Sequence, residues 1–205
     1  MADEPETDAS FSGQLERWLT TNDGPKTIGT LSEVFADRSI AVAILLLMFV
    51  PALPIPSGGV THVFEAISVI LAAEMVIGVR TLWLPRRWHQ RELGDTTTQK
   101  TIPFMVKRIR WFERFSRHRG TALLDQRWFV RLLGLVLIGL AVSAALAPPF
   151  SGLDTFPAMG AVIVALGIIL DDLLIVGIGA AVGAAGIAVI LTVGAALFRT
   201  IGHLL

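Results

Sequence analysis

The feature that most constrains this chain is a pair of long apolar runs near its C-terminal end. No charged residue occurs in the 26 positions from Leu173 to Phe198, or in the 15 positions from Phe156 to Leu170. A helix of about 20 apolar residues crosses a hydrocarbon layer about 30 Å thick. These runs therefore predict helices that enter or cross a membrane, and they argue against an ordinary soluble domain.

Two pairs of apolar segments, here called arms, are each separated by a stretch rich in proline and glycine. Proline removes an amide donor and clashes with the turn before it, so a helix ends at each interruption, here called a break. The second arm–break–arm pattern follows the first at an offset of 94 residues, so we predict an internal repeat. The successive segments are 39–53, the first break 51–59, and 61–78, followed by 132–147, the second break 148–152, and 156–170.

The predicted fold is an all-α polytopic membrane protein with two related helix–Pro/Gly break–helix hairpins and a C-terminal transmembrane helix. Each arm has only about 15 to 18 residues, so a hairpin could be re-entrant or fully spanning. The hairpins could also be parallel or inverted relative to each other. The expected regions are an acidic N-terminal region with short cytoplasmic or interfacial helices (1–37), the first membrane hairpin (38–80), a basic loop with an amphipathic helix (81–130), the second membrane hairpin (131–172) and the C-terminal transmembrane helix (173–205).

Charge is distributed unevenly although the net charge is zero. The stretch 80–131 holds thirteen of the 17 Lys and Arg residues and four acids. Basic residues between membrane segments favour the cytoplasmic side, so we place loop 81–130 in the cytoplasm and expect no nucleic-acid partner. Helix 102–118 has Ile102, Met105 and Ile109 on one side, which is typical of a helix lying on an anionic leaflet. The expected membrane-surface residues are Trp83, Arg86, Arg87, Lys107, Arg110, Arg114 and Arg117.

The breaks are the candidate binding sites, because a helix begins directly after each one. The free amides of a helix N-terminus favour anions. The alternative is that Thr61, Asp154 or Thr155 simply caps its helix. If the hairpins enter from opposite faces, the two helix starts converge near the midplane, and if they enter from one face they lie side by side. The candidate substrate-binding residues are Ser57, Gly58, Gly59, Thr61, Glu65, Ser151, Gly152, Asp154 and Thr155.

Acidic residues inside apolar segments are costly and usually face a partner or a cavity. Glu65 is the stronger candidate of the two in the second arm, with His62 three residues before it as the nearest partner. Glu74 is expected near the interface beside a basic residue. The adjacent Asp171 and Asp172 are interpreted as solvated charges at a helix end.

Motifs of soluble and membrane enzymes are missing from the sequence. It contains no GxSxG, P-loop or HExxH pattern, and it has no cysteine. We therefore expect no catalytic residue, no cofactor and no metal site, and the sequence favours a role other than catalysis.

Three segments resemble the exopolysaccharide synthesis ExoD family of bacterial membrane proteins. Residues 73–87, AEMVIGVRTLWLPRR, resemble the family's AQMLIGRxxPWLPRR run. Residues 155–158, TFPA, resemble its TLPA, and residues 166–172, LGIILDD, resemble its LGLLxxDG. The resemblance covers about residues 27–198. The chain departs from the family pattern at Glu74, Leu82, Asp154 and Leu173.

The resemblance implies a multi-pass protein of the bacterial inner (cytoplasmic) membrane that supports exopolysaccharide synthesis or export. No catalytic residue comes with it. One interpretation is a carrier that transports or presents an anionic substrate, with the lipid bilayer and an anionic lipid or lipid-linked saccharide as partners. The alternative is a non-catalytic scaffold subunit, partnered by polysaccharide-synthesis proteins or by further copies of the chain.

Overall fold

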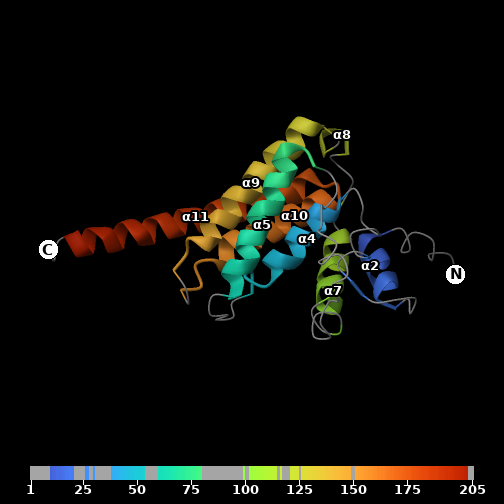
Figure 1. Ribbon diagram of the computed structural model, residues 1–205, viewed down its shortest axis with the longest axis horizontal. Coiled ribbons are helices and arrows are strands. Elements are labelled where there is room, and N and C mark those ends of the chain that lie inside the picture. Colours follow the sequence, from blue (N-terminus) through green and yellow to red (C-terminus); the bar gives the residue numbers. More distant parts are fainter. Residues whose placement is uncertain are drawn as a thin grey trace.

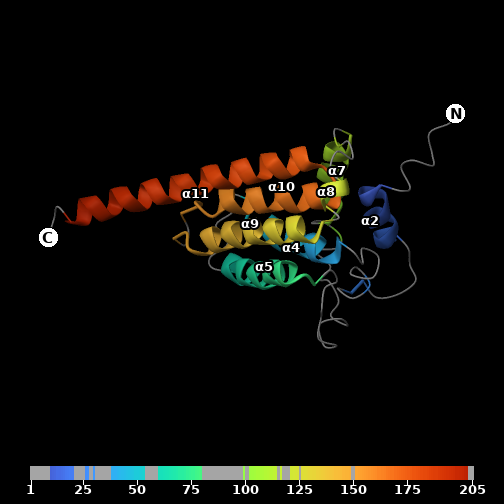
Figure 2. The ribbon, with the colours of Figure 1, turned by 90° about the horizontal axis from the view of Figure 1, so that it is seen from above.

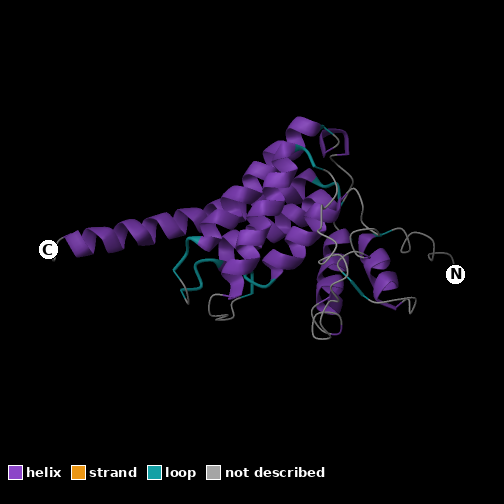
Figure 3. Cartoon of the chain, in the orientation of Figure 1, coloured by secondary structure: helices purple, strands orange, loops and turns teal. Residues whose placement is uncertain are grey.

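The computed structural model describes residues 10–20, 26–27, 30, 38–53, 60–79, 99, 102–114, 116, 121–124, 126–148 and 151–202. Every labelled element in Figure 1 is a helix, and Figure 3 shows no strand among the described residues. The protein is therefore all-helical over its described part. Its helices are α2 (Phe11–Thr20), α4 (Ser39–Phe49), α5 (Val60–Ile77), α7 (Ile102–Glu113), α8 (Thr121–Leu124), α9 (Arg127–Ala145), α10 (Thr155–Ile169) and α11 (Leu173–Gly202).

Four helices form a closed ring. Helix α4 packs on α5, α5 packs on α9, α9 packs on α10, and α10 packs back on α4. Helix α11 packs mainly along α10 and continues well beyond the other helices toward the C-terminus, as Figures 1 and 2 show. Helices α9 and α11 are long and apolar enough to cross a membrane, over Arg127–Ala145 and Leu173–Ala195.

Both breaks lie at the same end of the ring. In Figures 1 and 2, the end of α4 and the start of α5 lie at the end of the molecule where α9 ends and α10 starts. We call this region the break end. At the opposite end, Arg38 before α4 forms an ion pair with Asp171 after α10. The two helix pairs α4–α5 and α9–α10 therefore run in the same direction.

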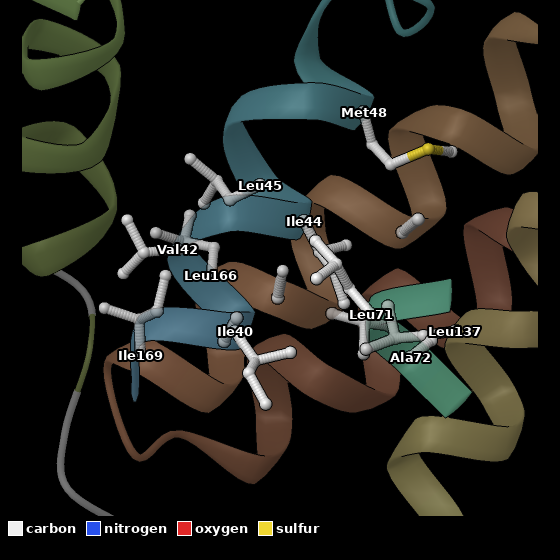
Figure 4. Close-up of a cluster of buried hydrophobic side chains, with 14 of the residues drawn as sticks. Ile40, Val42, Ile44, Leu45, Met48, Leu71, Ala72, Leu137, Leu166 and Ile169 are labelled. Atoms are coloured by element: carbon white, nitrogen blue, oxygen red, sulfur yellow. The ribbon is translucent and has the colours of Figure 1, made fainter. Parts of the chain in front are cut away.

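Helix α4 supplies the centre of the hydrophobic core. Ile40, Val42, Ile44, Leu45 and Met48 are all buried, although they point to different sides of the helix. Figure 4 shows these side chains beside residues of α5, α9 and α10, including Leu71, Ala72, Leu137, Leu166 and Ile169. A helix that is apolar all round is one that is covered on every side. Helix α4, with 11 residues, is therefore covered by the other helices of the ring, as expected for the central helix of a core.

Helices α10 and α11 approach closely through glycines. A Cβ atom added at Gly160 would lie 2.5 Å from the Cα of Gly183, and one at Gly179 would lie 2.5 Å from the amide nitrogen of Val164. Side chains at these positions would therefore collide with backbone. Small residues permit such close packing of apolar helices. The GxxxG motif at 179–183 is thus used inside the chain.

Helix α7 packs against α2. The backbone amide of Ser12 donates to Oε1 of Glu113 at 2.8 Å, and Arg110 forms an ion pair with Glu16. The apolar side of α7, at Ile102, Met105 and Ile109, is buried in the same cluster as Leu15 and Trp18 of α2.

This burial corrects the sequence-based expectation that the apolar side of helix 102–118 faces lipid. The side is covered by protein, and α7 ends at Glu113. A period of 3.6 residues indicates that one side of a helix is covered, but it does not identify what covers it.

The turn between α10 and α11 corrects a second expectation. Asp171 and Asp172 are buried, at 9% and 1% exposure, so they are not solvated charges. Asp171 has a φ of 53°, and the amide of Asp172 donates to the carbonyl of Gly167 at 2.9 Å, as in a Schellman C-cap. Oδ1 of Asp172 accepts from the amide of Leu174 at 2.9 Å and so caps the start of α11. Each acid therefore holds one part of the turn.

Candidate functional site

A buried acidic side chain lies near the break end. Glu65 is on the second turn of α5, and its side chain is 0% exposed. Its Oε2 lies 2.7 Å from Nδ1 of His62, whose side chain is 33% exposed. Residues three apart on a helix lie on the same side, which brings the two side chains together. The pair proposed from the sequence is thus formed, and it links a buried carboxyl to a partly exposed imidazole.

The second oxygen of the carboxyl is unusual. Oε1 of Glu65 is buried and has no hydrogen-bond partner among the described residues. An unpaired polar atom away from water raises the free energy of the folded state by about 1 to 3 kcal/mol. A native structure that retains such an atom calls for an explanation, such as a role in binding or proton transfer.

The surroundings of Glu65 hold few charges. The described parts of α4, α5 and α10 contain no Lys or Arg, and the two arginines of α9 lie in its first two turns, away from the break end. Asp154, at the start of α10, is a second acid whose charge acts on Glu65. His62 is therefore the titratable group that pairs with Glu65, and Asp154 is a second acid at the same end of the ring.

The second break is held by local contacts. Oγ of Ser151 donates to the carbonyl of Pro148 at 2.6 Å and accepts from the amide of Leu153 at 3.2 Å. Gly152 has a φ of 68°, a conformation that glycine adopts without steric cost. Asp154 occupies the N-cap position of α10 but makes no side-chain capping bond. The capping role considered for Asp154 is thus not seen, and the amides of Thr155 and Ala158 donate to the carbonyls of Gly152 and Asp154, at 3.3 and 3.0 Å.

The other sequence-predicted residues are distributed as follows. Thr61 is buried and Thr155 half-buried at the starts of α5 and α10. Lys107 and Arg114 are exposed at α7, away from the pair of Glu65 and His62, and Arg110 is engaged with Glu16. The predicted residues that lie outside the described ranges are Ser57, Gly58, Gly59, Trp83, Arg86, Arg87 and Arg117.

Glu74 is the second acid of α5. It lies in the last turn of the helix, where Gly78, with a φ of 97°, and Val79 close a Schellman C-cap on its carbonyl. Its Oε2 is buried without a hydrogen-bond partner among the described residues. The basic partner expected for Glu74 is not seen within the described part of the chain.

One group at the opposite end was missed by the sequence reading. Arg127, Trp128 and Arg131 are exposed on the first turns of α9, and Trp128 is 59% exposed. The predicted arm began at Leu132, so Arg127 and Trp128 were assigned to loop 81–130 and Arg131 to the first position of the second hairpin. Their signal was available, because arginine and tryptophan beside an apolar segment are typical of a membrane interface.

Comparisons with known proteins place this arrangement in a class. Two helices, α9 and α11, are long and apolar enough to cross a membrane, and the ring is all-helical over the described residues. The family model described as "Exopolysaccharide synthesis, ExoD" matches residues 11–192. The chain therefore belongs to the ExoD family, which is involved in exopolysaccharide synthesis. A relative from Synechocystis sp., described as "Uncharacterized protein slr1875", is 26% identical over 174 residues, covering 83% of this chain and 81% of the relative. No solved structure matches the chain.

Proposed function

We propose that this protein supports exopolysaccharide synthesis or export by binding an anionic, lipid-linked substrate at the break end and transporting or presenting it. The observation that carries the proposal is the buried carboxyl of Glu65, with one oxygen paired to His62 and the other without a hydrogen-bond partner among the described residues. Such a group within an apolar helix is costly and points to a ligand or a proton.

Two further features suit a lipid-linked anion. Helices α5 and α10 both start at the break end, where the positive end of each helix dipole favours an anion. On its outward side, α5 carries an exposed apolar stripe at Val63, Ile70 and Ile77. This stripe offers a surface for a hydrocarbon chain while the charged group occupies the break end.

A scaffold subunit is the second candidate function. The observation that favours it is the part of α11 that extends beyond the ring, with Val189, Leu191 and Val193 exposed. In a scaffold, this apolar surface would pack against another membrane protein, and no ligand would occupy the break end.

The substitution Glu65→Gln distinguishes the two functions. It keeps the shape of the side chain and removes the acid, and Glu74→Gln on the same helix is the matched control. A carrier is expected to lose about tenfold of its exopolysaccharide yield with Glu65→Gln, a loss equivalent to about 1.4 kcal/mol in the limiting step. Yield is measured in a strain lacking the native gene, at protein levels matched by immunoblot.

The opposite result identifies the scaffold. If Glu65→Gln supports the same yield as the unaltered protein and Glu74→Gln at equal protein levels, the carboxyl has no role in a carrier. The residues to substitute next are then the exposed apolar ones of α11, Val189, Leu191 and Val193.

A further inference from the structure

The proposed function raises an electrostatic problem at the break end. An anionic substrate there meets two acids, Glu65 and Asp154, and the described helices of the ring supply no Lys or Arg near them. Like charges close together in a site of low dielectric constant repel strongly. An anion could therefore bind only if a positive charge or a proton enters with it.

We propose that the His62–Glu65 pair takes up a proton when the anionic substrate binds and releases it when the substrate leaves. This inference rests on the proposed function and names the regulation of the same site. Proton uptake neutralises the carboxylate, so the break end becomes less negative by one charge. The helix amides can then act on the anion without the opposition of Glu65.

The geometry provides a short proton path. His62 presents Nδ1 to Oε2 of Glu65 at 2.7 Å, and a third of its side chain is exposed. His62 donates its Nδ1–H to Oε2, and when solvent protonates Nε2 the proton on Nδ1 passes to Oε2. The imidazole is then neutral, with its proton on Nε2, so the pair gains one proton in total. A histidine in contact with both water and a buried acid is suited to this transfer.

The surrounding elements supply few other groups that could take the proton. On α4, α9 and α10 the described residues near the break end include Asp154 as the further titratable side chain. The burial of Glu65 favours this site over Asp154, because a neutral carboxyl is accommodated away from water at much lower free-energy cost than a carboxylate. Oε1, which has no hydrogen-bond partner among the described residues, keeps its capacity to accept a bond.

Isothermal titration calorimetry tests the inference directly. Farnesyl phosphate, a short lipid phosphate, is titrated into the purified full-length protein in nanodiscs at one pH in two buffers of different ionisation enthalpy. The difference in heat gives the number of protons taken up on binding. We expect about one more proton per bound ligand for the unaltered protein than for Glu65→Gln, because linkage equates a change in protonation with a change in affinity.

The variants separate the protein's proton from that of the phosphate. Glu74→Gln is expected to keep the uptake of the unaltered protein, and His62→Gln to lose most of it, because Glu65 then lacks the imidazole that favours its carboxylate before binding. Thermal melting of each variant in the same nanodiscs confirms folding. Binding with equal proton uptake in the unaltered protein and in both Glu65→Gln and His62→Gln would overturn the inference and leave the proposed function standing. Absence of binding to the unaltered protein at every pH tested would overturn the anionic-substrate function itself.

Discussion

At the scale of single residues, similar side chains have different roles because of what surrounds them. Glu65 and Glu74 lie on one helix, yet Glu65 pairs with His62 and Glu74 sits beside a helix C-cap. The sequence identified the His62–Glu65 pair through its spacing of three residues. It did not identify the ion pair of Asp171 or the capping bond of Asp172, because the partner of Asp171 is distant in the chain and that of Asp172 is a backbone amide.

Asp171 provides a test of this local argument. Its positive φ disfavours residues with a Cβ atom, while its carboxylate pairs with Arg38. Asp171→Gly and Asp171→Ala both remove the ion pair, but only glycine relieves the backbone strain. We expect Asp171→Ala to be less stable than Asp171→Gly by about 1 kcal/mol. Thermal melting in nanodiscs measures the order, and an alanine variant as stable as the glycine variant would contradict the left-handed conformation.

At the scale of helices, charge-free runs and prolines located the apolar helices, because they mark where such helices end. The agreement varies, since α4 ends four residues before the expected 53 and α9 begins five residues before the expected 132. The arms expected at 61–78 and 156–170 are α5 and α10, displaced by a single residue at each end. The partner of α7 did not follow, since the same amphipathic pattern suits lipid or protein. Tertiary pairing depends on side-chain shapes that a single sequence does not reveal.

The packing of α10 on α11 gives a prediction for glycines. A Cβ at Gly160 would lie 2.5 Å from backbone of α11, whereas one at Gly177 would meet no atom within 4 Å. Gly160→Ala is therefore expected to destabilise the protein by about 1 to 3 kcal/mol through overpacking. Gly177→Ala is expected to be neutral or to stabilise by about 0.5 to 1 kcal/mol, because alanine favours a helix. Melting temperatures of the two variants check the contrast, and equal losses would show that the two helices do not pack in this way.

At the scale of the whole molecule, both breaks lie at one end, and the exposed Arg127, Trp128 and Arg131 lie at the other. The sequence left open whether the hairpins are re-entrant or spanning, because arm length alone is ambiguous. The structure adds an outward apolar stripe on α9 at Leu132, Leu135, Val142 and Leu146. At 1.5 Å per residue, the 19 residues of α9 extend about 28 Å, close to the thickness of the hydrocarbon layer.

This length predicts that the two ends of α9 face opposite sides of the membrane. Because the chain has no cysteine, Ser151→Cys and Arg131→Cys each provide a single reactive thiol at an exposed position. Positively charged residues favour the cytoplasmic side, so Ser151→Cys is expected to react with a membrane-impermeant maleimide in spheroplasts. Arg131→Cys is expected to react only after permeabilisation. Labelling of both positions only after permeabilisation would show that α9 and α10 form a re-entrant hairpin, and the Glu65–His62 pair would then lie within the membrane rather than near its outer face.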